Sequence, residues 1–165
     1  MNFRITKQLS VALLALLTLQ GCIDYRDDPV CSELNYMTFE EFRAKGVEIL
    51  EAREIKEAGK IYIYKTTLLV IEKNQGVHVI DNSDRKNPKP KVFIKVDGNL
   101  DMAVKDGYLY LDSYMDLVVL NINDLESIKE INRVNDSFNY DPYQNYQANG
   151  CDFNMTNGLV VGGER

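Results

Sequence analysis

The chain has little of the side-chain chemistry on which most active sites and metal sites depend. It holds one histidine, His78, among 165 residues, and a single histidine excludes a zinc site built from several His ligands. None of its three cysteines stands in a motif that would pair it with a base for nucleophilic catalysis. Gly-x-Ser-x-Gly, phosphate-binding, dinucleotide-binding and calcium-loop motifs are missing. We therefore predict no catalytic, cofactor-binding or metal-binding residue, and an enzyme is the less favoured class.

The longest apolar run is too short to cross a membrane. Leu9 to Leu19 is apolar apart from two hydroxyl residues, whereas a membrane-spanning helix needs roughly 20 apolar residues. The run follows a basic start and ends at Leu19-Gln20-Gly21-Cys22, which resembles a bacterial lipobox. We therefore predict a lipoprotein signal peptide over residues 1–21 and attachment of lipid, palmitate included, at Cys22. The alternative is a buried or membrane-spanning helix that happens to end in cysteine.

Negative charge outnumbers positive charge in the expected mature chain. Removing Arg4 and Lys7 with the leader leaves 17 basic and 25 acidic side chains, a formal charge of −8. This charge argues against a nucleic-acid partner and against electrostatic binding to anionic lipid, so we expect contact with the membrane through the lipid anchor. The acid-rich stretch Asp24–Asp28 is either a sorting signal toward the cell surface or a solvated tether. The expected location is the cell envelope, on the periplasmic or surface face of the outer membrane.

Two cysteines remain after lipidation, Cys31 and Cys151. An exported chain enters an oxidising compartment in which disulfides persist. A bridge between these two residues would close a long loop, for which theory gives a large stabilisation. Two separate thiols, or a link to another chain, are the alternatives.

The chain repeats itself at a shift of 40 residues without a gap. Leu69–Glu72 falls on Leu109–Asp112, and Val77–Asp81 falls on Leu117–Asn121. A period near 40 made of short strands is typical of β-propeller blades; a plain antiparallel meander with chance similarity is the alternative. We predict an all-β fold, a partial β-propeller of about two four-stranded antiparallel blades with a short N-terminal helix. A third blade is expected to begin near Gly158.

Each repeat divides into strands rich in β-branched and aromatic residues. The expected strands are Lys60–Lys65, Leu68–Glu72, Val77–Asp81 and Val92–Val96 in the first repeat, and Met102–Lys105, Tyr108–Asp112, Leu117–Ile122 and Ile131–Val134 in the second. Asp106-Gly107 predicts a tight hairpin. Ahead of the repeats, Thr38 and Glu41 fit a capping box and Gly46 a helix stop, and Val47 to Ile55 is expected to be an extended strand.

Two segments carry a family resemblance. Gly76-Val77-His78-Val79-Ile80-Asp81-Asn82-Ser83-Asp84 and Asp116-Leu117-Val118-Val119-Leu120-Asn121-Ile122-Asn123-Asp124 resemble the LVIVD repeat, whose motif runs roughly Gly-Leu-Val-Ile-Val-Asp-Val-Ser-Asp-Pro. That family occurs in exported bacterial β-propeller proteins, many of them lipoproteins. The resemblance implies blade architecture and no particular chemistry. The second copy departs from the motif at Asn121, which stands in place of its aspartate.

The sequence thus predicts four segments. Residues 1–21 are the signal peptide, 22–36 a lipidated tether, 37–135 the propeller-like repeats, and 136–165 a Tyr/Asn-rich loop with a C-terminal strand. The tyrosines of the last segment either pack on the blades or form a surface for sugar or protein. His78 alternates with two valines, so we expect it on the opposite face of its strand, buried or half-exposed.

The remaining acids are expected to act locally. Most stand at strand ends or turns, where aspartate is favoured by hydrogen bonds to nearby backbone. They are Asp97, Asp101, Asp106, Asp112, Asp116, Asp124, Asp136 and Asp141.

Three functions are compatible with these features. A binding or scaffold lipoprotein would use propeller loops or strand faces against a protein or glycan, and the lack of catalytic motifs favours it. An enzyme module completed by missing blades or a partner chain is the alternative, and so is a non-functional truncated remnant, which the small number of repeats favours. Propellers close with about four to eight blades, so we also expect self-association through open blade edges.

Overall fold

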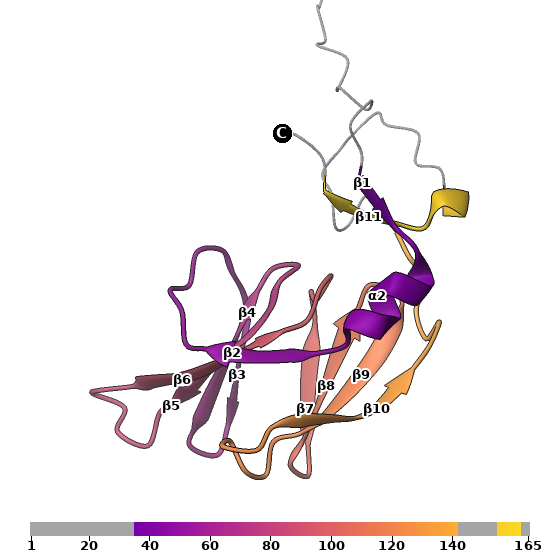
Figure 1. Cartoon of the computed structure of the whole chain (residues 1–165). Helices are drawn as coiled ribbons and strands as arrows, with labels where there is room; N and C mark the ends of the chain where they lie inside the picture. The colour runs from indigo at the N-terminus through magenta and orange to yellow at the C-terminus, as the bar shows by residue number, and fades with distance from the viewer. Residues whose placement is uncertain (1–34, 142–154, 163–165) are drawn as a thin grey trace, which may run out of the picture.

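The computed structural model describes residues 35–141 and 155–162, and in this part of the chain the fold is all-β apart from one α-helix and one turn of 3-10 helix (Figure 1). The first sheet has the strand order β2 (Glu48–Glu51), β6 (Lys89–Lys95), β5 (Gly76–Asp81), β4 (Thr67–Glu72) and β3 (Ala58–Tyr64). The second sheet has the order β10 (Lys129–Val134), β9 (Asp116–Asn121), β8 (Tyr108–Ser113) and β7 (Met102–Lys105). Every pair of neighbours is antiparallel.

Two four-stranded meanders, β3 to β6 and β7 to β10, therefore follow one another along the chain. This arrangement confirms the predicted all-β class, and all eight predicted strands are present. The extended segment expected after the helix is present over Glu48–Glu51, where β2 adds a fifth strand beside β6, and residues 52–55 are not in a strand. The two sheets are not joined edge to edge into a closed ring in the described part of the chain.

The local turn and cap signals are confirmed. Asp106 and Gly107 both have positive φ, 52° and 83°, and connect β7 to β8 as a two-residue hairpin. The helix α2 (Phe39–Lys45) begins at Thr38, whose hydroxyl accepts the amide of Glu41 at 3.2 Å while the Glu41 carboxylate accepts the Thr38 amide at 3.0 Å. The helix ends at Gly46, with φ 63°.

The two sheets pack against each other through one apolar core. Each sheet contributes buried aliphatic side chains from its central strands, because alternate strand residues face the same side. The first sheet supplies Leu69, Ile71, Val77, Val79 and Ile94, and the second supplies Leu109, Leu111, Val118 and Leu120. We call these the inner faces of the two sheets, and the opposite sides their outer faces.

The ungapped alignment of the two repeats is wrong by one residue in the first half of each unit. Leu69 pairs with Val79 across β4 and β5, and a shift of 40 residues would place this pair on Leu109 and Val119. Leu109 instead pairs with Leu120. The residue of the second sheet that is equivalent to Leu69 is therefore Tyr110, the neighbour of Leu109, because Tyr110 pairs with Val119.

The slip arises at the hairpin turns. The turn between β4 and β5 has three residues, Lys73–Gln75, whereas the turn between β8 and β9 has two, Tyr114–Met115. The preceding hairpin turns, Lys65–Thr66 and Asp106–Gly107, are 41 residues apart. Successive strand residues point to opposite faces. The difference of one residue in turn length therefore places the core-facing side chains of β8 on the face of their unit opposite to that used by β4. The sheets therefore stack with unlike faces in contact.

The strand expected near Gly158 is present, and in the described residues it pairs with β1 (Asn35–Met37) and not with a further meander. This strand, β11 (Leu159–Gly162), forms a two-stranded antiparallel sheet with β1, after the 3-10 turn η2 (Met155–Asn157). Gly158 has φ 107°, and a Cβ there would lie 2.2 Å from the Met37 carbonyl oxygen. The close approach of the two backbones at this glycine places the strand beside β1 instead.

A second, smaller core lies under this pair of strands. Phe42 of α2 is buried with Met115 and Leu159, and its ring meets Tyr114 edge-on at 5.3 Å between centroids. The turn between β8 and β9 thus packs on the helix and the C-terminal strand. In the described ranges, no helix is long and apolar enough to cross a membrane.

Candidate functional site

The Asp116 carboxylate accepts four hydrogen bonds and is fully buried at the start of β9. Its Oδ1 accepts Arg43 Nη2 at 2.8 Å and the Asp136 amide at 3.1 Å. Its Oδ2 accepts Arg43 Nε at 3.0 Å and Arg133 Nη1 at 3.4 Å. The carboxylate thereby joins the helix, the second sheet and the chain after β10.

Burial alone would favour the neutral form of Asp116, because charge is poorly solvated there. The two guanidinium groups and the Asp136 amide outweigh burial and hold the pKa of Asp116 below its usual range. Hydrogen bonding to Asp116 in turn raises the pKa of Arg43. Both oxygens are engaged by these donors, so we interpret Asp116 as a structural clamp and not as a general acid or base.

A second buried carboxylate, Glu72, ends β4. It accepts the Lys56 amide at 2.9 Å, the Glu57 amide, and His78 Nε2 at 2.9 Å. His78 is buried as expected, and it stacks at a tilt on Phe93 with 4.7 Å between ring centroids. Burial opposes the charge of Glu72, but these hydrogen bonds lower its pKa. The pair holds the segment between β2 and β3 on the outer face of the first sheet.

Glu72→Gln is expected to loosen that segment. An amide NH2 placed near two backbone amides leaves a buried donor unsatisfied, which costs about 1–3 kcal/mol of the free energy of unfolding. Hydrogen exchange should show faster exchange of the Lys56 and Glu57 amides. Glu57→Gln is the matched control, because the Glu57 side chain is exposed and only its backbone meets Glu72. Unchanged exchange in Glu72→Gln would show that the segment is held by other contacts.

The second sheet uses an acid in a related way. Asp112 of β8 accepts the backbone amides of Leu100 and Asp101 at 2.8 and 2.9 Å, and the Asn99 side-chain amide at 2.8 Å. Burial raises the pKa of Asp112, although the three hydrogen bonds oppose the shift. In each four-stranded meander, therefore, an acid near the end of the second strand along the chain (Glu72 in β4, Asp112 in β8) holds the segment that leads into the first strand (β3 or β7).

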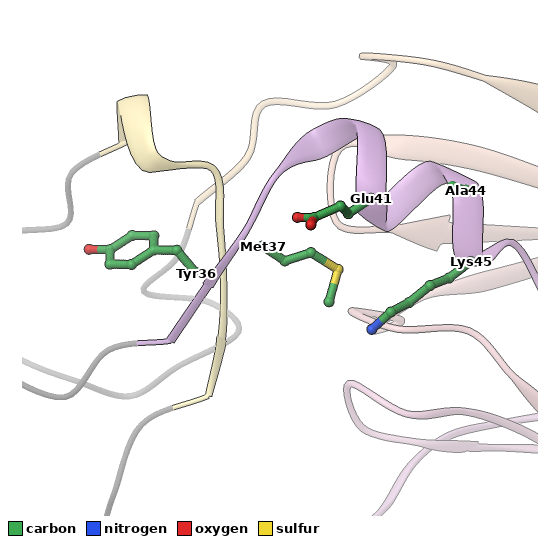
Figure 2. A pocket seen from close by; sticks show the side chains of 5 residues that line it. All are labelled: Tyr36, Met37, Glu41, Ala44 and Lys45. Atoms are coloured by element: carbon green, nitrogen blue, oxygen red, sulfur yellow. The ribbon is translucent and has the colours of Figure 1, made fainter.

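An open groove lies between β1 and α2. It has a volume of about 530 Å³ and is lined by Tyr36, Met37, Glu41, Ala44 and Lys45. Figure 2 shows Met37, Glu41 and Lys45 reaching toward the same space, while the Tyr36 ring points away from it. Glu41 is already engaged by Thr38 through the helix cap, which lowers its pKa. The groove therefore offers an apolar wall and one amine, without a catalytic arrangement.

The residues that sequence analysis singled out are not brought together by the described structure. Cys22, Cys31 and Cys151 lie outside the described residues, so lipidation and the disulfide stay predictions. No group of three or more His, Cys, Asp or Glu side chains within 35–141 and 155–162 is arranged to hold a metal ion.

The contacts of Asp116 and Asp112 with distant parts of the chain were not expected from the sequence. Asp116 and Asp112 were expected to bond locally, yet Asp116 binds arginines distant in sequence. The one available signal was that Asp116 directly precedes the apolar run Leu117–Leu120.

Comparisons with known proteins add no assignment. No protein-family model, curated protein or solved structure matches the chain.

Proposed function

We propose that the chain is an exported lipoprotein, anchored to the outer membrane through Cys22, whose LVIVD-type repeats form a propeller-like module that binds or scaffolds a protein or glycan. The lipobox-like end of the leader supports the anchor. The period near 40 and the two successive four-stranded meanders support the module.

One observation favours binding over catalysis. The buried ionisable groups Asp116, Glu72 and His78 are engaged in hydrogen bonds that join secondary-structure elements. Meanwhile Ile61 and Ile63 of β3 are 63% and 61% exposed. Clustered exposed apolar side chains are typical of interaction surfaces, whereas a catalytic acid or base must reach a substrate.

Cys22→Ala in the full chain is expected to abolish labelling by radioactive palmitate and to leave an unprocessed precursor. The reason is that the Cys22 thiol is the predicted acceptor of the lipid. Cys31→Ala is the matched control and should be labelled and fractionate with the outer membrane like the unaltered chain. Continued labelling of Cys22→Ala would contradict the anchor.

Saturable binding of an envelope glycan or protein by the anchored chain would support the binding module, and chemical turnover of that ligand would contradict it.

A further inference from the structure

The outer faces of both sheets carry apolar side chains. On the first sheet, pairing places Ile61 beside Val70, and Ile63 beside Leu68, on the side that His78 occupies. On the second sheet, pairing places Tyr110 beside Val119, and Leu117 beside Val134. Val134 is 45% exposed. Two sheet faces with apolar residues thus point away from the shared core.

The outer face of each sheet is equivalent to the inner face of the other sheet. Because of the one-residue slip, Tyr110 and Val119 on the outer face of the second sheet occupy the places of Leu69 and Val79. The latter two lie on the inner face of the first sheet. The contact within the chain therefore joins one face of a unit to the opposite face of the next unit. The same two kinds of face are left on the outside, one on each sheet.

We propose that the protein partner of the exposed apolar surface is a second copy of this chain, which stacks its first sheet on the second sheet of its neighbour as the two sheets stack within one chain. This inference rests on the binding function proposed above. β3 lies close to β7 inside the chain, so β3 of one copy would lie beside β7 of the next. Its Ile61 and Ile63 would then pack toward Tyr110. Such a contact is heterologous and closes into a ring when the rotation per copy permits. A propeller of four to eight blades corresponds to about two to four copies.

Part of the outer face of the first sheet is already covered within the chain. The segment between β2 and β3 covers one end of the first sheet, where Arg53 lies 3.7 Å above the centre of the Phe93 ring. It leaves Ile61 and Ile63 exposed at the β3 side. Val70 and Phe93 are already buried within the chain, so the exposed part of the proposed contact is β3 of one copy, which meets β7 and β8 of the next. The contact extends toward Val134 at the outer strand.

The test uses two differently tagged forms of the full chain, co-expressed and extracted in a mild detergent. Ile63→Arg places a charge on the outer face of the first sheet, and Val134→Arg does so on the second. Ile49→Arg is the matched control, because Ile49 is 41% exposed on β2 but pairs with inner-face Ile94. Light scattering gives the protein mass, and circular dichroism reports folding. Ile61→Arg repeats the first change if Ile63→Arg fails to fold.

A heterologous contact gives a distinctive result. The unaltered chain and Ile49→Arg should form one defined oligomer, while Ile63→Arg alone and Val134→Arg alone should be monomers. Mixing these two variants should restore a dimer, because each retains the face that the other lacks. A monomeric unaltered chain would overturn the proposal. So would an oligomer that survives in Val134→Arg alone, which would indicate contact between like faces or edges.

Discussion

Asp116→Ala is expected to lower the free energy of unfolding by about 3–5 kcal/mol, the range for removing one partner from a buried ion pair. The carboxylate is fully buried, while the side chains of Arg43 and Arg133 are only 26% and 12% exposed. Without Asp116, two guanidinium groups lie close together with less counter-charge, and the Asp136 amide loses its acceptor. Urea denaturation followed by circular dichroism measures the change.

Asp136→Ala is the matched control for this prediction. Asp136 also binds Arg43, at 2.9 Å, but its side chain is 74% exposed. Exposed ion pairs contribute about 0–1 kcal/mol, so this variant should be nearly as stable as the unaltered chain. Equal losses in both variants would mean that burial does not set the strength of the Arg43 contact.

The same clamp should make stability depend on pH. The folded pKa of Asp116 is held below its usual range, so the folded state favours the charged form. Its contribution is therefore complete above the unfolded pKa of about 3.9 and is lost as pH falls through the lower folded value. Asp116→Asn should show a flatter decline of the free energy of unfolding between neutral and acidic pH. If the free energy of unfolding declined as steeply with falling pH in Asp116→Asn as in the unaltered chain, other carboxylates would account for the acid sensitivity.

Gly76→Ala is expected to destabilise the first sheet by about 3–5 kcal/mol, which is exceptional for a single substitution. Gly76 begins β5 with φ 136°, and a Cβ there would lie 2.0 Å from the carbonyl oxygen of Ile94 and 2.8 Å from the Val96 amide nitrogen. These are backbone atoms, so the neighbouring strand must shift. The strained φ adds about 1–3 kcal/mol for a residue with a side chain. Thermal and urea unfolding measure the loss.

Gly46→Ala provides the comparison. Gly46 also has positive φ, 63°, but a Cβ there meets no atom within 4 Å. Only the conformational cost of φ 63° with ψ −153° remains, so a loss of about 1–3 kcal/mol is expected, without the added cost of a clash. If Gly76→Ala and Gly46→Ala cost the same, the close approach to β6 would not be the cause.

The place of Gly76 also shows how the two units differ. Asp116 occupies the equivalent place at the start of β9. The turn before it is one residue shorter, and Asp116 is not among the residues with positive φ. A side chain is therefore accommodated there, and it reaches Arg43. The sequence shows a glycine at this place in the first unit and an aspartate in the second, but the role of the aspartate depends on its three-dimensional neighbours.

The sequence by itself determined the local structure of this protein. The strands, the Asp106-Gly107 turn and the Thr38 cap could be predicted from the sequence, because each depends on residues that are close together along the chain. That His78 points to the opposite side also followed from strand alternation, since its neighbours Val77 and Val79 fill the inner face, but its burial on the outer face depends on contacts with Glu72 and Phe93.

Only the tertiary structure decided which faces meet and which acids are buried. A shift of 40 matched apolar residues in β4 and β8 even though their faces are reversed, because both faces of these strands carry apolar residues and composition cannot distinguish them. Asp116 has the same chemistry in a turn or in a core. Its burial depends on arginines 73 residues before it and 17 after it, and contacts at such separations are fixed only when the sheets and the helix pack.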